Sequence, residues 1–149
     1  MAVEIERKFL VNKELWEQVK PNEGQRILQG YLLKSVEKTV RLRTKGGKGY
    51  ITVKGASVNH ISRAEFEYEI PLEEAQAMLD EFCPKKIDKV RYTLKVAGKI
   101  WEVDEFSSPN PGLILAEIEL TAEDESFEMP EWAEKEVSDD ERYYNANML

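Results

Sequence analysis

The sequence has a single cysteine, Cys83, and a single histidine, His60. One cysteine excludes a disulfide within the chain, so a reducing cytoplasm is the location that we expect. One histidine excludes a metal site built from several imidazoles. His60 lies in a polar loop, where we expect a solvated side chain rather than a catalytic base. Cys83 follows an amphipathic segment and precedes a proline, and we expect it to be structural.

Long apolar runs are missing as well. No stretch of the sequence approaches the ~18 apolar residues of a membrane-spanning helix, and the N-terminal residues lack the apolar core of a signal peptide. The chain also has no internal repeat and no low-complexity linker. We therefore expect one domain over residues 1–149 that has no membrane partner.

Positive charge is in short supply overall. The sequence has 21 Lys and Arg against 29 Asp and Glu, which gives a net charge of −8. A nucleic-acid-binding protein usually presents a basic surface, so we do not expect nucleic acid as a partner. Charged residues still make up 34% of the chain, more than the ~25% of an average domain. This excess of charge must have a place in the fold.

What the sequence does contain is charge at every second position, with mainly apolar residues between. Successive side chains of a β-strand point to opposite faces, so such segments predict strands with one charged and one apolar face. Six short segments show the pattern: Glu4-Ile5-Glu6-Arg7-Lys8, Arg41-Leu42-Arg43, Glu65-Phe66-Glu67-Tyr68-Glu69, Lys89-Val90-Arg91, Glu102-Val103-Asp104 and Glu117-Ile118-Glu119.

Strands dominate the predicted secondary structure. We expect them over residues 3–11, 26–35, 39–44, 50–54, 63–70, 86–96, 99–105 and 113–120. Helices are expected over 13–20, over 71–82, as two short acidic helices around 121–128 and 130–134, and after Ser138. Short turns at 46–49 and 97–98 favour antiparallel pairing. The predicted fold class is α+β: an eight-stranded antiparallel β-barrel, or tunnel, with a few short flanking helices and a C-terminal helix.

We expect the charged faces of the strands to line the inside of this barrel. A single strand of this kind more often has a solvated charged face, but the few helices cannot cover the apolar face of an open sheet. An eight-stranded barrel has an interior that side chains fill, or that holds one small ligand. Enclosed charges are costly unless paired or bound. A divalent cation would relieve clustered carboxylates, and a polyanion would suit the Arg and Lys residues.

The ordered motifs resemble the CYTH superfamily, the triphosphate tunnel metalloenzymes, and in particular its short bacterial triphosphatase-like members. The resemblance covers nearly the whole chain. It is carried by Glu4-x-Glu6-x-Lys8, Gln29-Gly30-Tyr31-Leu32, Arg41-x-Arg43, Thr52-Val53-Lys54-Gly55, Glu65-x-Glu67, Lys89-x-Arg91, Asp104, Glu117-x-Glu119, Glu136-Val137-Ser138 and Arg142-Tyr143-x-Asn145. Glu134 and Ser138 stand where members of this family commonly have Gly and Thr. These differences concern how the C-terminal helix packs against the barrel more than they concern the chemistry.

The resemblance implies a tunnel that binds triphosphate together with Mg²⁺ or Mn²⁺. It implies that the metal ligands are Glu4, Glu6 and Glu119, with Glu117, Asp104, Glu65 and Glu67 supporting the first metal or binding a second. It implies that the triphosphate is bound by Lys8, Arg41, Arg43, Lys54, Lys89 and Arg91. Lys8 and Tyr31 are the pair implied to position or activate the attacking water. For Tyr31, ordinary packing beside Gly30 is an equally good interpretation.

The implied activity is metal-dependent hydrolysis of a terminal phosphoanhydride, with inorganic triphosphate as the favoured substrate. A class IV-like adenylate cyclase that makes cyclic AMP from ATP is the first alternative, and a thiamine triphosphatase is another. A non-catalytic polyphosphate- or nucleotide-binding module ranks lower. The expected partner is therefore a small polyphosphate or a nucleoside triphosphate, and a homodimer is an open alternative to a monomer.

Overall fold

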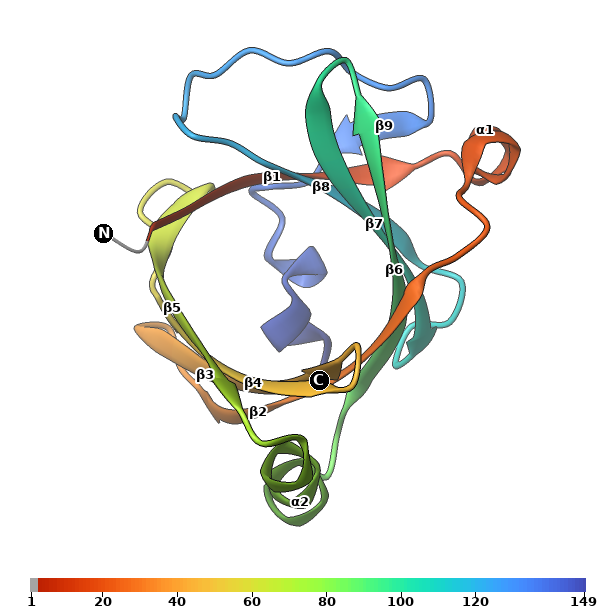
Figure 1. Ribbon diagram of the computed structural model, residues 1–149. Helices are drawn as coiled ribbons and strands as arrows, with labels where there is room; N and C mark the ends of the chain where they lie inside the picture. Colours follow the sequence, from red (N-terminus) through yellow and green to blue (C-terminus); the bar gives the residue numbers. More distant parts are fainter. Residues whose placement is uncertain (1–2) are drawn as a thin grey trace.

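The computed structural model describes residues 3–149; the first two residues of the predicted domain lie outside this range. The described chain forms a closed barrel of eight antiparallel strands (Figure 1). These strands are β1 (Val3–Val11), β2 (Gln25–Lys34), β3 (Lys38–Lys45), β4 (Lys48–Gly55), β5 (Ser62–Ile70), β6 (Ile87–Val96), β7 (Lys99–Ser108) and β8 (Ile114–Glu119). The predicted α+β class and eight-stranded antiparallel barrel are confirmed.

The first strand closes the ring. The order of neighbours is β5-β4-β3-β2-β6-β7-β8-β1, and β1 pairs back onto β5. One edge of β1 pairs with β5 at Val3–Ile5 and, further along, with a short ninth strand, β9 (Ala133–Glu136). The other edge pairs with β8 over Glu6–Leu10. Closure in this way satisfies the backbone groups that an open sheet would leave at its edges.

Two α-helices lie outside the barrel (Figure 1). The α1 helix (Lys13–Val19) starts after Asn12, whose side-chain oxygen accepts a hydrogen bond from the Leu15 amide, 3.1 Å. The α2 helix (Leu72–Phe82) packs its apolar stripe against the sheet, with Leu79 buried beside Leu42 and Cys83. Both helices were predicted, and the structural role expected for Cys83 agrees with its burial. Neither helix is long and apolar enough to cross a membrane, and the part of the chain described here has no other candidate.

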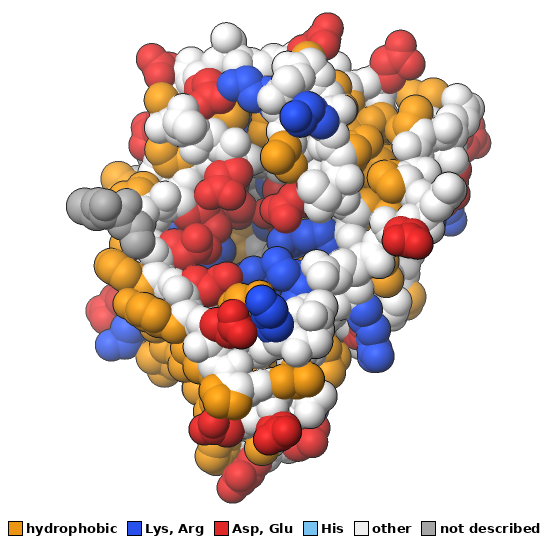
Figure 2. Space-filling model, in the orientation of Figure 1, with side chains coloured by type: hydrophobic (Ala, Val, Ile, Leu, Met, Phe, Trp, Pro, Cys, Tyr) orange, Lys and Arg blue, Asp and Glu red, His pale blue; other side chains and the backbone are white. Residues whose placement is uncertain are grey.

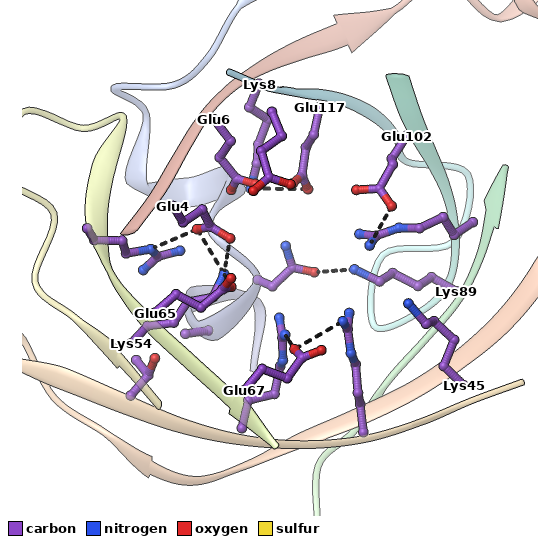
Figure 3. Close-up of a pocket in the computed structure, with 18 of the residues that line it drawn as sticks. Glu4, Glu6, Lys8, Lys45, Lys54, Glu65, Glu67, Lys89, Glu102 and Glu117 are labelled. Carbon is purple, nitrogen blue, oxygen red and sulfur yellow. Dashed lines mark hydrogen bonds and ion pairs between the residues drawn. The ribbon is translucent and has the colours of Figure 1, made fainter. Parts of the chain in front are cut away.

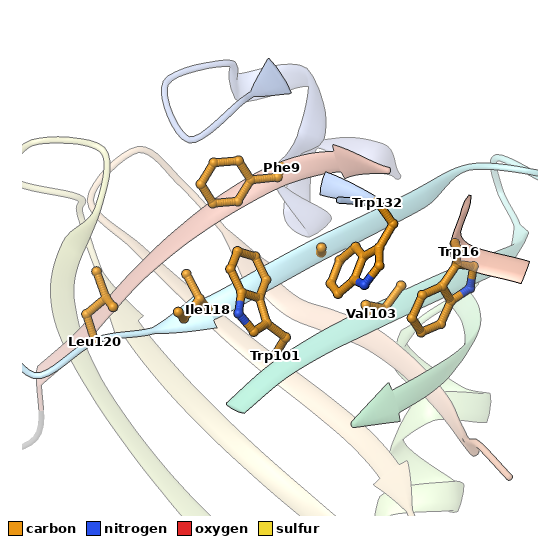
Figure 4. Close-up of a cluster of buried hydrophobic side chains, with 8 residues drawn as sticks. Phe9, Trp16, Trp101, Val103, Ile118, Leu120 and Trp132 are labelled. Atoms are coloured by element: carbon orange, nitrogen blue, oxygen red, sulfur yellow. The ribbon is translucent and has the colours of Figure 1, made fainter. Parts of the chain in front are cut away.

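An aromatic cluster covers the outer face of β1, β7 and β8 (Figure 4). Trp101 and Trp132 lie 5.6 Å apart between ring centroids, and Trp16 and Trp132 lie 5.3 Å apart, in edge-on arrangements. Phe9 packs against Trp101 at 5.5 Å. Edge-on aromatic pairs add to the gain from burying their surface. The three tryptophans therefore stabilise the wall of the barrel, as packing residues.

Two predicted helices around 121–128 and 130–134 do not form, which corrects the secondary structure expected there. Residues 121–132 have no helix, and residues 133–136 form β9 instead. The main reason is tertiary, because Phe127 and Trp132 both pack in the aromatic cluster. A local reason adds to it, since Pro130 interrupts this run of acidic residues. Short polar segments lack the propensity to hold a helix against such packing.

The predicted C-terminal helix is also corrected. The segment after Ser138 forms two short 3₁₀ turns, Glu141–Tyr143 and Asn145–Met148, in place of a continuous α-helix. It lies across the ring when the barrel is viewed along its axis (Figure 1). Tyr143 and Met148 pack against buried apolar residues of the barrel, including Ile87. A segment this short does not hold an α-helix by its own propensity, and short 3₁₀ turns are common as connectors.

Gly30 marks a close approach between the barrel and α2. A Cβ atom built at this position would lie 2.7 Å from the Cβ and 2.9 Å from the Sγ of Cys83. We expect Gly30→Ala to lower the free energy of unfolding by about 1–3 kcal/mol, since overpacking a tight contact forces the chain to shift. Urea denaturation measures the change.

Gly55→Ala is the matched control for this substitution. Gly55 also lies in a strand, and the nearest atom to its Cβ position is 3.6 Å away. The control should be neutral or slightly stabilising, because alanine restricts the unfolded chain. Equal unfolding free energies for the two variants would show that the contact with Cys83 is not tight.

Candidate active site in the tunnel

The charged faces of the strands surround a cavity of about 220 Å³ inside the barrel. Figure 2 shows it as a hollow with Asp and Glu side chains gathered on one side and Lys and Arg side chains on the other. Its carboxylates are Glu4, Glu6, Glu65, Glu67, Glu102, Glu117 and Glu119. Its cations are Lys8, Arg41, Arg43, Lys45, Lys54, Arg63, Lys89 and Arg91. Eight cations against seven carboxylates leave one positive charge in excess, inside a protein whose net charge is −8.

The inward orientation of the charges is therefore confirmed, and every predicted site residue except Asp104 lines the cavity. Asp104 lies behind the lining and is 1% exposed. One of its oxygens is 2.8 Å from Lys89 Nζ, and the other accepts a hydrogen bond from Arg91 Nε, 2.8 Å. This placement favours a role in holding two tunnel cations over the metal-ligand role that the resemblance implied.

Carboxylates crowd together where β1 meets β8 (Figure 3). Glu6 stands directly opposite Glu119 in the strand pairing, and Lys8 stands opposite Glu117. Burial and the negative charges of Glu117 and Glu4 raise the pKa of Glu6 well above its usual range. Burial and neighbouring carboxylates, first that of Glu4, raise the pKa of Glu119 as well. Like charges placed directly opposite each other destabilise a sheet, and the raised pKa values relieve this repulsion because they favour the protonated, neutral carboxyl groups.

Glu4 is paired with two cations of the tunnel. Lys54 Nζ donates to both of its oxygens, at 3.0 and 2.9 Å, and Arg63 Nε donates to one at 3.3 Å. Burial acts to raise the pKa of Glu4, but these cations outweigh it and the pKa falls to about 2. Lys54 also lies 3.4 Å from Glu65, whose pKa is raised by burial and by its contact with Glu4. Glu4 is therefore ionised under all ordinary conditions.

Arginines from β3 form the opposite wall. Arg41 Nη2 and Arg43 Nη2 both donate to the same oxygen of Glu67, at 3.4 and 3.3 Å. Thr52 Oγ1 donates to that oxygen too, at 2.8 Å. Burial and the charges of Arg41 and Arg91 lower the pKa of Arg43 to about 10. Within residues 3–149, the Nε atoms of Arg41 and Arg43 are buried and have no hydrogen-bond acceptor. These crowded guanidiniums would be stabilised by an anion.

Lys8 and Tyr31 both line the cavity, as the proposed pair requires. Lys8 Nζ donates to the Tyr143 carbonyl, 2.9 Å, and the Tyr31 hydroxyl accepts a long hydrogen bond from Gln29 Nε2, 3.4 Å. Burial raises the pKa of Tyr31, although Arg41 and Lys8 pull it down. The effect of burial therefore outweighs the lowering of the Tyr31 pKa that the Lys8 ammonium could produce. The hydroxyl keeps its proton, which suits a hydrogen-bond donor better than a base. Tyr31 also packs against the apolar cluster that contains Ile87.

Several lining residues were not named as site residues from the sequence, although Glu102 belongs to a predicted charged segment and Asn145 to the C-terminal motif. These are Thr39, Lys45, Arg63, Glu102, Asn145 and Ala146. Four of them follow the same two-residue period as the predicted residues: Thr39 and Lys45 flank Arg41 and Arg43, Arg63 precedes Glu65, and Glu102 precedes Asp104. Extending the alternation to the ends of the strands would have found Thr39, Lys45 and Arg63, and Glu102 was already part of an alternating segment. Asn145 and Ala146 come from the C-terminal segment, where no periodicity points to the tunnel.

His60 does not line this cavity, although it lines a smaller adjoining pocket together with Glu4, Glu6 and Lys8. Its side chain is exposed, and its Nδ1 is 3.3 Å from the Tyr144 hydroxyl. This agrees with the solvated loop position expected for it.

The CYTH domain family model matches residues 2–144 of this sequence. The chain belongs to the CYTH family. A protein of Acetivibrio thermocellus named inorganic triphosphatase is 45% identical over 150 aligned positions, which cover 100% of this chain and 94% of that protein. A Nitrosomonas europaea protein of the same name is 33% identical, with 95% and 93% covered.

A solved structure shares the fold. The crystal structure of an inorganic triphosphatase superimposes with a TM-score of 0.64 and 30% identity, over 99% of this chain and 94% of that one. The family resemblance seen in the sequence motifs is thereby confirmed over nearly the whole chain. In this protein the charged motifs of the CYTH family face a common cavity inside the barrel.

The donor set in the tunnel of this CYTH protein fits a hard divalent cation. Carboxylate oxygens are the ligands that Mg²⁺ and Mn²⁺ prefer, and burial together with neighbouring carboxylates raises the pKa values of Glu6 and Glu119, as expected where carboxyl groups crowd together. In the part of the chain that the structure describes, no three His, Cys, Asp or Glu side chains form a ready-made metal cage.

Proposed function

We propose that this CYTH protein is a divalent-metal-dependent triphosphatase that hydrolyses a terminal phosphoanhydride, most favourably that of inorganic triphosphate. The observation that carries the proposal is the tunnel, in which eight cations and seven carboxylates face one cavity. The relatives named inorganic triphosphatase support it, because they align along nearly the full length of this chain.

In this proposal the substrate lies among the cations of the tunnel. Lys8, Arg41, Arg43, Lys54, Lys89 and Arg91 bind its phosphate oxygens. Arginine offers a planar fork of N–H donors that matches phosphate oxygens, and lysine offers a compact charge. Charge on the transferring phosphoryl group is stabilised by donors that are already in position, at no cost of reorganisation. Asp104 holds Lys89 and Arg91 in this position.

The metal would be held by Glu4, Glu6 and Glu119, with Glu117, Glu65 and Glu67 supporting it or binding a second ion. Mg²⁺ and Mn²⁺ are the ions that these ligands favour. A bound divalent cation supplies charge neutralisation on the phosphate oxygens and polarises the bond that is cleaved.

Water attacks the terminal phosphorus in line with the leaving pyrophosphate. Lys8 and Tyr31 lie in the lining where they can orient that water. Because the Tyr31 hydroxyl keeps its proton, we assign it the task of hydrogen-bond donor. Lys8, held by the Tyr143 carbonyl, contributes positive charge next to the reacting group.

The adenylate cyclase alternative is less well supported by the lining. A cyclase must hold a nucleoside and present its 3′-hydroxyl, and adenine binds well against aromatic or apolar surfaces. Tyr31 is the one aromatic side chain among the described residues that line the tunnel. A thiamine triphosphatase has the same requirement for a large organic group. Both remain alternatives to be separated by experiment, as does a binding module without turnover.

A substrate panel tests the proposal. Phosphate release is measured with triphosphate, ATP and thiamine triphosphate, with Mg²⁺ and Mn²⁺ supplied separately. We expect triphosphate to be hydrolysed fastest with at least one of the two ions. Cyclic AMP formed from ATP without release of orthophosphate would establish the cyclase instead. Tight binding of triphosphate without turnover under any condition would favour the binding module.

The cytoplasmic location and the homodimer, which were expected from the sequence as a location and as an open alternative to a monomer, stay predictions.

A further inference from the structure

The C-terminal segment reaches the tunnel at Asn145. This residue starts the second 3₁₀ turn, and it lines the cavity together with Ala146. On either side of it, Tyr143 and Met148 pack into the apolar cluster beneath the tunnel. The position of Asn145 is therefore defined by packing on both flanks.

Asn145 has a defined orientation because of its partner. Lys89 Nζ donates to Asn145 Oδ1, 3.0 Å, and also lies 2.8 Å from Asp104 Oδ2. An ammonium can only donate, so the oxygen of the amide must face Lys89. The other atom of the amide, Nδ2, carries two N–H donors and belongs to a side chain that faces the tunnel.

The same segment also holds a second tunnel lysine. The Tyr143 carbonyl accepts a hydrogen bond from Lys8 Nζ, 2.9 Å. Lys8 comes from β1 and Lys89 from β6, so three consecutive residues, 143–145, bridge the two lysines. An anion bound by both lysines would lie within reach of the segment between their two contacts.

We propose that Asn145 is a substrate-binding residue, whose Oδ1 fixes Lys89 while its Nδ2 donates a hydrogen bond to a phosphate oxygen of triphosphate. This inference rests on the proposed function, because it takes triphosphate as the ligand. It adds a neutral donor to a site otherwise built from charges. It also gives the C-terminal segment a direct part in binding.

Substitutions at Asn145 test its part in triphosphate binding. Asn145→Ala removes both halves of the amide, and we expect triphosphate to bind about tenfold more weakly, as for the loss of one hydrogen bond to a charged group. Asn145→Asp keeps an oxygen for Lys89 but replaces the N–H donors with a negative charge. The aspartate variant should therefore bind triphosphate several-fold more weakly than the alanine variant. Isothermal titration calorimetry with triphosphate and no added metal measures binding without turnover.

If Asn145 acted only through Lys89, Asn145→Ala would cause no further loss of affinity in a Lys89→Ala background, and that result would overturn the proposal. Alanine at 145 with wild-type affinity would overturn it too, even if the aspartate variant failed to fold. Asn147→Ala is the matched control, since Asn147 is exposed and its Nδ2 donates to the Glu141 carbonyl, 3.0 Å. It should bind triphosphate like wild type. Failure of the wild-type protein itself to bind or hydrolyse triphosphate would refute the proposed function, which is a distinct result.

Discussion

Replacing Glu6 by glutamine is expected to lower the rate of triphosphate hydrolysis at least about a hundredfold, the usual loss when one preorganised transition-state interaction is removed. Glu6 stands opposite Glu119, and its pKa is raised by burial and by the charges of Glu117 and Glu4. The amide has almost the same shape but lacks the negative charge that a hard cation requires. Steady-state phosphate release over a series of Mg²⁺ and Mn²⁺ concentrations measures the loss.

The fold should withstand this substitution. Because the glutamine removes one of several crowded negative charges, the thermal midpoint of the metal-free variant should not fall below that of wild type. Glu73→Gln is the matched control: it makes the same chemical change at an exposed position on α2, outside the barrel. The control should hydrolyse triphosphate at the wild-type rate. An active Glu6→Gln variant, within a few-fold of wild type, would remove Glu6 from the proposed metal ligands.

Arg43→Ala is expected to cause a loss of similar size, at least about a hundredfold in kcat/KM. The Arg43 side chain lies in the tunnel and is 7% exposed as a residue, and its Nη2 donates to Glu67 at 3.3 Å. Burial, together with the nearby positive charges of Arg41 and Arg91, lowers the pKa of its guanidinium to about 10. Such a cation is held in place for an anion, and alanine removes both its charge and its fork of donors.

Kinetics separate the two ways in which Arg43 can act. A fall in kcat means that Arg43 stabilises the transition state, and a rise in KM alone means that it binds substrate and transition state equally. Arg43→Lys should recover part of the activity, since it restores the charge without the fork. Arg26→Ala is the control, because Arg26 is exposed and pairs with Asp88 on the outside of the barrel. Wild-type rates for Arg43→Ala would refute its place in the triphosphate clamp.

The barrel could be predicted because its signal is local. Alternation of charged and apolar residues shows which side chains share a face, and turns such as Gly46-Gly47 show where the chain reverses. All eight predicted strands are present, with ends that differ by three residues or fewer. The inward direction of the charges followed from counting the helices available to cover the other face.

Depth within the tunnel could not be predicted in the same way. Glu102 and Asp104 share one face of β7, yet Glu102 lines the cavity while Asp104 is enclosed by Lys89 and Arg91. Periodicity assigns a side chain to a face, but neighbouring strands decide whether that side chain reaches the open space. The role of Asp104 is therefore a property of the assembled barrel.

Sequence by itself determined the eight strands of the barrel, the two α-helices, the charged face of the sheet and nearly all of the residues on it. The tertiary structure alone decided the conformation of residues 121–132 and of the C-terminal segment. Phe127 and Trp132 are drawn into an aromatic cluster, and Asn145 is brought beside Lys89 from a distant part of the chain. Periodicity reports interactions between near neighbours in sequence, whereas these positions depend on contacts that exist only once the barrel has closed.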